Sequence, residues 1–186
     1  ISYTVSRPGA GTDEAVGTYT DAIVPTGEAT QGNYSVTYKS AAFEIKTNET
    51  ALTISGNDGG GVYTGNAYTL NDVAASLPGA TIEYKVGEGE WSAKAPSATA
   101  VAESQSKTIS VRASMTGYKT AELDGLSIIV TPAPVVVTAD AASKAFAEKD
   151  PSFTAKVSGM VNGESDSLIS YTVSRPGAGT DEAVGT

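Results

Sequence analysis

The sequence contains no cysteine and no histidine among its 186 residues. Ser-His-Asp and Cys-His catalysis, and metal sites built on either residue, are therefore impossible. Carboxylate pairs remain, but the acidic residues are scattered through turns such as 87–90 and 180–182. We expect no enzyme activity, no catalytic residue, no metal and no cofactor. A long exported chain that avoids mispaired thiols also lacks cysteine, which favours an extracellular location.

Basic residues are also few, since 12 Lys and Arg stand against 21 Asp and Glu, for a formal net charge of −9. Nucleic acid and anionic membranes repel such a chain, so we expect neither as a partner. Long apolar runs are missing too, and residues 1–18 lack the basic start and apolar centre of a signal peptide. We expect no membrane insertion here, and any targeting or anchoring segment to lie outside this sequence.

What the sequence does have is a series of short runs rich in Val, Ile, Thr and Tyr, separated by Gly, Pro, Asn and Asp. This alternation predicts an all-β fold of small antiparallel β-sandwich modules, Ig-like or β-grasp-like, in an elongated array. The one candidate for a short helix is the Ala-rich stretch 140–149, which Asp150-Pro151 would end. The expected strands are residues 34–38, 42–46, 51–54, 82–86, 108–113, 126–131, 135–139, 152–157 and 169–174.

The chain opens and closes on the same eighteen residues, ISYTVSRPGAGTDEAVGT, at positions 1–18 and 169–186. The offset of 168 residues predicts one repeat plus an overlap, taken from a longer protein. A polar joint at 47–50 and the stiff Thr131-Pro-Ala-Pro134 segment then divide the chain. We expect one complete unit at 50–132 and two partial units at 1–49 and 133–186.

Joining 135–186 to 19–49 through the shared ends gives a second unit with several family motifs. They are Val137-Thr-Ala139, Ser143-Lys144, Asp150-Pro151, Gly159, Gly17-Thr-Tyr19 or Gly185-Thr186, Asn33-Tyr34 and Phe43-Glu-Ile45. This unit resembles the MBG-type repeats of bacterial surface adhesins, many of which carry Tyr-Gly where this chain has Phe146-Ala147. With VYTGNAYTL, IEYKVGEGEWS and ISVRASMTGYKT, residues 50–132 are similar to Ig-like modules of Gram-positive surface proteins.

The resemblance implies that 1–49 is the C-terminal part of an MBG-like unit and that 133–186 is the N-terminal part of the next. Half a sheet leaves unpaired backbone groups and an apolar face, so we expect the next copy to complete it. The partners are then neighbouring repeats, or copies of the chain joined head to tail. The implied function is an extended stalk or self-associating filament segment of a bacterial surface adhesin, outside the cell.

A carbohydrate- or mucin-binding module is the alternative, because aromatic faces pack on sugar rings. Its candidate contacts are Tyr63, Tyr68 and Trp91, although aromatic residues in alternating strands are more often core or cross-strand pairs.

Three further patterns have simpler explanations. Residues 162–166 resemble a calcium loop without its sixth-position glycine and twelfth-position acid, so we expect a solvated turn. The NDGGG run at 57–61 has no Lys-Ser/Thr after it and is interpreted as a floppy hairpin turn rather than a phosphate loop. Stalk modules sometimes form Lys-Asn or Lys-Asp amide crosslinks, for which the candidates are Lys85, Lys107, Lys144, Lys156, Asn33 and Asn66.

Overall fold

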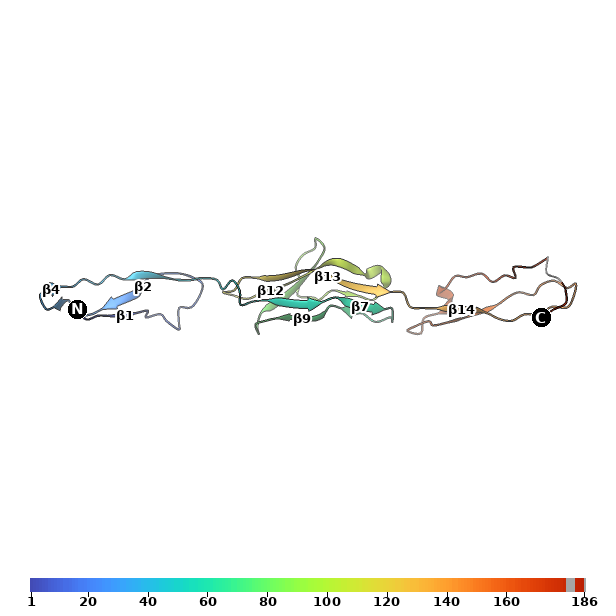
Figure 1. Cartoon of the computed structure of the whole chain (residues 1–186), viewed down its shortest axis with the longest axis horizontal. Coiled ribbons are helices and arrows are strands. Elements are labelled where there is room, and N and C mark those ends of the chain that lie inside the picture. The colour runs from blue at the N-terminus through green and yellow to red at the C-terminus, as the bar shows by residue number, and fades with distance from the viewer. Residues whose placement is uncertain (180–182, 186) are drawn as a thin grey trace.

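A computed structural model describes residues 1–179 and 183–185. The chain is drawn out along one axis, with the two termini at opposite ends (Figure 1). We call residues 1–49 the head, 50–132 the middle unit and 133–186 the tail; the division at these residues stays a prediction. The described residues form strands and two short 3-10 turns, so the predicted all-β class is confirmed. No described segment forms a helix of the length and apolarity that crossing a bilayer requires.

The head is a small antiparallel sheet without a buried core. Strand β1 (Thr4–Ser6) pairs with β2 (Gly17–Thr26), which pairs with β5 (Ala41–Ile45), and a tight hairpin joins β3 (Thr30–Gln31) to β4 (Tyr34–Ser35). None of residues 1–49 is buried. The apolar side chains of this sheet therefore stay at least partly exposed to solvent, because too few residues pack around them.

The middle unit carries the largest sheet, in the order β10-β12-β13-β7. The β7–β13 pair is parallel, whereas β10, β12 and β13 pair antiparallel. Two smaller ladders, β6–β9 and β8–β11, complete the unit. The strands are β6 (Ile54–Asn57), β7 (Gly59–Val62), β8 (Tyr68–Thr69), β9 (Asn71–Ala75), β10 (Thr81–Val86), β11 (Ser97–Ala98), β12 (Gln105–Ser114) and β13 (Ala121–Thr131), with the 3-10 turn η1 (Val101–Glu103) before β12.

Alternation along β12 and β13 builds the core of the middle unit. Ile109, Val111 and Ile128 are fully buried, and side chains from β6, β8, β9 and β11 pack on the same cluster. Every buried residue of the described chain lies between Leu52 and Val130. The middle unit thus has the one buried core among the described residues.

The tail contains one two-stranded ladder, β14 (Val136–Ala139) with β15 (Ala155–Ser158), and the 3-10 turn η2 (Asp166–Leu168). None of its described residues is buried, and Phe146 and Leu168 are 70% and 67% exposed. Like the head, the tail leaves apolar side chains in contact with solvent.

Several expected elements differ from the structure. The candidate helix 140–149 is wrong: these residues form a loop with a turn in which Ala147 adopts φ +68°, a left-handed conformation that a helix does not allow. The floppy turn at 57–61 is also wrong, because Gly59–Val62 is strand β7, held by four register pairs to β13.

Other strands are shortened, shifted or absent. Residues 169–174 form no strand, although the same sequence forms β1 in the head, where it pairs with β2; within the described tail no strand pairs with these residues. Strands expected at 34–38, 51–54 and 152–157 are observed as β4, β6 and β15 with different ends. The turn expected at 180–182 lies outside the described residues.

The left-handed turn at Ala147 gives a testable consequence. An L-residue with a Cβ is disfavoured at φ +68° by about 1 kcal/mol relative to glycine. We expect Ala147→Gly to increase the protection of this loop from hydrogen exchange and from limited proteolysis. Ala145→Gly, two residues earlier and without positive φ, is the matched control and should not protect the loop. Equal or lower protection in Ala147→Gly would contradict this expectation.

Candidate functional site

The three aromatic residues expected to contact glycans occupy two different parts of the middle unit. Tyr63 and Tyr68 pack against the core cluster from the β7–β8 side, and the Tyr68 hydroxyl donates to the Val62 carbonyl at 2.7 Å. Trp91 follows β10, and two cations lie against its ring: the Arg112 guanidinium at 4.4 Å and the Lys85 ammonium at 5.1 Å from the centroid. Cation–π contacts of this kind stabilise the local fold.

Arg112 connects the Trp91 ring to the sheet. Its Nε donates to Glu83 Oε2 at 2.9 Å, and Glu83 lies opposite Arg112 in the β10–β12 ladder. The indole therefore rests on a cross-strand ion pair. This arrangement holds Trp91 against the β10–β12 ladder, whereas Tyr63 directly follows β7.

Tyr63 also marks the junction between the middle unit and the tail. Its hydroxyl donates to the Glu164 carboxylate, and that hydrogen bond to an anion raises the pKa of Tyr63. A cavity of about 230 Å³ lies beside this contact, lined on the tail side by Val135, Gly159 and Ile169. Glu164 belongs to the 162–166 segment, where Asn162 and Gly163 adopt positive φ in a turn and Ser165 caps η2.

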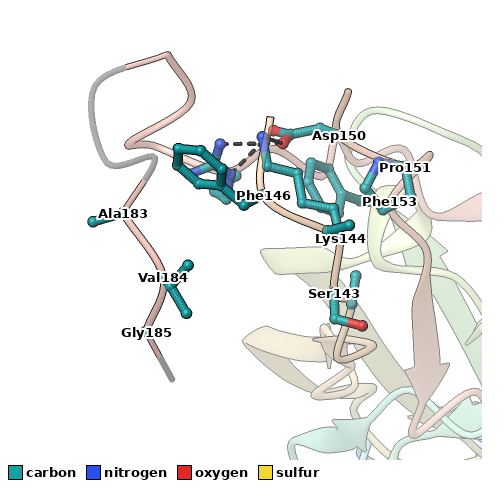
Figure 2. Close-up of a pocket in the computed structure, with 12 residues that line it drawn as sticks. Ser143, Lys144, Phe146, Asp150, Pro151, Phe153, Ala183, Val184 and Gly185 are labelled. Atoms are coloured by element: carbon teal, nitrogen blue, oxygen red, sulfur yellow. Dashed lines mark hydrogen bonds and ion pairs between the residues drawn. The ribbon is translucent and has the colours of Figure 1, made fainter. Parts of the chain in front are cut away.

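The most organised group of charged side chains in the tail centres on Asp150. Lys144 Nζ lies 2.9 Å from Asp150 Oδ1, and Arg175 contacts both carboxylate oxygens, at 3.0 and 3.1 Å. These side chains are 23–30% exposed. They line an open pocket of about 470 Å³ with Phe146 and Phe153 on one wall and Ala183–Gly185 on another (Figure 2).

The charges decide what this group can do. Arg175, followed by Lys144, lowers the pKa of Asp150 through hydrogen bonds to the ionised carboxylate. Folding lowers the pKa of Asp150 below its ordinary value of 3.8. The stabilisation from its ion pairs is therefore fully present above pH 3.8 and is lost only as the pH falls below that value. Amide formation needs a neutral amine and a protonated acid, so this geometry favours an ion pair over a Lys144–Asp150 crosslink.

Of the other candidate lysines, Lys156 also lies near a carboxylate, 3.4 Å from Asp140, but it is 83% exposed, as in an ordinary surface ion pair. Lys85 rests against Trp91. Asn33 and Asn66 are exposed in turns. Within the described residues, no group of three or more acidic side chains is arranged to hold a metal ion.

The arginine of the repeated segment occurs twice, in two environments. Arg7, the head equivalent of Arg175, forms an ion pair with Glu14 and donates to the Asp13 carbonyl at 2.9 Å. Its guanidinium also lies 4.7 Å from the centre of the Phe43 ring. In the tail, the equivalent Arg175 binds Asp150.

Comparison with known proteins finds a family match in the tail. Residues 135–186 match the MBG domain (YGX type). The predicted resemblance is thereby confirmed for this MBG segment. The resemblance of 50–132 to Ig-like modules stays a prediction. No curated protein and no solved structure matches the chain.

The Asp150 cluster was not found by sequence reasoning. Ser143-Lys144 and Asp150-Pro151 stood out only as family motifs, and the arginine of the repeat was not singled out. This arginine occurs in both copies of the repeated segment, as Arg7 and Arg175. That recurrence could have pointed to an ion pair, because a basic residue in an acidic chain has several carboxylates within reach. The partner itself depends on the path of the loop between β14 and β15, which spacing does not reveal.

Proposed function

We propose that this chain is a structural repeat of a bacterial surface protein, displayed outside the cell as part of an extended stalk. The observation that carries the proposal is the linear arrangement in Figure 1, in which the head, middle unit and tail follow one another along the long axis. The MBG segment supports it, since such domains suggest repeats of surface proteins. The role is mechanical: the repeat supplies length and resistance to pulling.

Hydrogen bonds join the three parts at their ends. On the head side, Asn48 exchanges backbone hydrogen bonds of 2.9 Å with Gly117 and Lys119. On the tail side, Tyr63 donates to Glu164, and the Pro132-Ala-Pro134 segment leads out of β13. Prolines at alternate positions keep this connection extended. In such an array, stability is close to a sum over units and junctions.

The topology of the middle unit suits a load along the chain. The chain enters near β6 and β7 and leaves through β13, and β7 and β13 are parallel neighbours paired from Ile128↔Gly59 to Thr131↔Val62. Pulling on the two ends therefore loads this ladder in shear, so that several hydrogen bonds must break together.

Single-molecule pulling on the full chain tests the proposal. We expect one dominant unfolding event, from the middle unit, that lengthens the chain by about 25 nm, as roughly 80 residues reach full extension. Disrupting the β7–β13 ladder should lower the unfolding force. Extension without a force peak would contradict a load-bearing role. Binding to mucin glycans that Trp91→Ala abolishes would favour the carbohydrate-binding alternative instead.

A further inference from the structure

The Asn162-Gly163 pair occupies an exposed turn where the tail meets the middle unit. Asn162 and Gly163 adopt φ +54° and +68°, and the Glu164 N–H donates to the Val161 carbonyl at 3.1 Å. Positive φ at both central residues is the mark of a type I′ turn, for which Asn-Gly is the preferred sequence. Both residues are exposed, and no other asparagine of the sequence precedes a glycine.

The reactive groups of this pair have room to meet. Within the described part of the chain, neither the Asn162 carboxamide nor the Gly163 N–H takes part in a hydrogen bond. Gly163 has no Cβ, and no atom lies within 4 Å of the position that one would occupy. Rotation about the Cα–Cβ and Cα–C bonds of Asn162 therefore brings its Cγ to the Gly163 nitrogen, closing a five-membered ring.

We propose that Asn162 is a self-modification site, at which intramolecular deamidation converts the asparagine to aspartate and isoaspartate. The Gly163 nitrogen gives its proton to water and bonds to the Asn162 Cγ, and the carboxamide nitrogen leaves as ammonia. The product is a succinimide, which water opens. Hydrolysis of the bond from the Gly163 nitrogen to Cγ gives aspartate, and hydrolysis of its bond to the main-chain carbonyl carbon gives isoaspartate. Water is the one co-reactant, and no oxidant or reductant takes part.

The same turn makes the contact between the tail and the middle unit. A Cβ built on Gly65 would lie 2.6 Å from the Cβ, Cγ and Nδ2 atoms of Asn162, so the Asn162 side chain lies directly against the Gly65 backbone. Two residues later, the Glu164 carboxylate accepts from the Tyr63 hydroxyl. Val161 and Glu164 also line the junction cavity of about 230 Å³. Two contacts between the units thus depend on one turn.

Deamidation changes both the charge and the length of this turn. Each product replaces a neutral carboxamide with a carboxylate, two residues from Glu164. Isoaspartate also routes the main chain through the former side-chain carbons, which lengthens it by about 1.5 Å. The packing on Gly65 and the position of Glu164 opposite Tyr63 cannot both be kept. We expect the junction to loosen, so that the tail turns more freely about the extended 132–134 connection.

The reaction makes the junction sensitive to the age of the protein. Ammonia is lost to solvent, so converted chains accumulate and the average stiffness of the junction falls with time. The inference concerns only the turn at 161–164 and the loop that follows β7. It requires neither a surface location nor a mechanical load, so its test does not depend on the proposed function.

Incubation of the full chain in ¹⁸O-labelled water tests the reaction. Mass spectrometry with peptide fragmentation should show Asn162 gaining about 3 Da, from the exchange of an NH group for labelled oxygen. Asn66 is the internal control, because it is also exposed but precedes Ala67. Asn162 should convert at least about tenfold faster, since Ala67 carries the Cβ that Gly163 lacks. Absence of label at Asn162, or equal conversion at Asn66, would overturn the proposal.

A distance measurement tests the effect on the junction. The chain has no cysteine, so spin labels can be placed on Glu122→Cys of β13 and Lys156→Cys of β15, both exposed strand positions. After conversion, the distribution of distances between the labels should be at least about 1.5-fold wider than in fresh protein.

The matched control for ageing is Asn162→Gly in the same labelled chain. Glycine keeps the positive φ of the turn and has no carboxamide to lose, so its distribution should be the same in fresh and aged protein. A wild-type distribution that stays unchanged after Asn162 has converted would contradict the loosening of the junction. Equal broadening in Asn162→Gly would assign the change to another process and would also overturn the proposal.

Discussion

Ile128→Ala is expected to lower the free energy of unfolding of the middle unit by about 2–5 kcal/mol. Ile128 is fully buried in β13, with Gln105 of β12 on one side and Gly59 of β7 on the other. Truncation removes apolar contact area and leaves a cavity that neighbouring strands cannot close without breaking their ladders. For a unit of this size, the melting temperature should fall by at least about 10 °C.

Denaturation followed by the fluorescence of Trp91, the only tryptophan, reports on this unit. The matched control is Ile129→Ala, one residue further along the same strand. Ile129 is 37% exposed on the opposite face, so its loss should change stability by less than about 1 kcal/mol. If the two variants melted together, the assignment of the β13 faces would be wrong.

The second large effect is expected at Gly60, in the run of glycines that forms β7. Gly60 has φ +124°, and a Cβ there would lie 2.0 Å from the Ile129 carbonyl oxygen. Because the obstacle is the backbone of the neighbouring strand, Gly60→Ala must separate β7 from β13. We expect a loss of about 3 kcal/mol or more in the unfolding free energy, measured by the same fluorescence.

Gly79→Ala separates the two causes of this loss. Gly79 has φ +86° but no atom within 4 Å of the position of a Cβ. Its substitution should show the conformational penalty alone, about 1 kcal/mol. A Gly60→Ala variant as stable as Gly79→Ala would show that β7 does not lie against β13.

The sequence predicted the strands that carry alternating apolar side chains. Residues 82–86, 108–113 and 126–131 were located because their alternation reflects burial on one face. Strand β7 was missed because three glycines have no side chains to alternate; here glycine permits the close approach of Gly59 to Thr69 and of Gly60 to Ile129.

Identical residues do not always form identical structure, and this limits prediction at the chain ends. The repeated segment is a strand in the head and a loop in the tail, because a strand exists only where another strand pairs with it. Prediction of the glycan-contact candidates Tyr63, Tyr68 and Trp91 met a similar limit, because their neighbours come from distant parts of the sequence. Nothing in the sequence near Trp91 reveals that Arg112, on another strand, lies against its ring.

Hydrogen exchange of the full chain at low and high protein concentration tests most directly whether the ends are complementary halves of one unit. In dilute solution, amides of β12 and β13 should exchange slowest and those of β14 and β15 at least tenfold faster, because the tail has no buried core. At concentrations that permit assembly, protection of β14 and β15 should rise, while β12 and β13 stay unchanged. A tail as protected as β12 and β13 in dilute solution, and insensitive to concentration, would contradict the account.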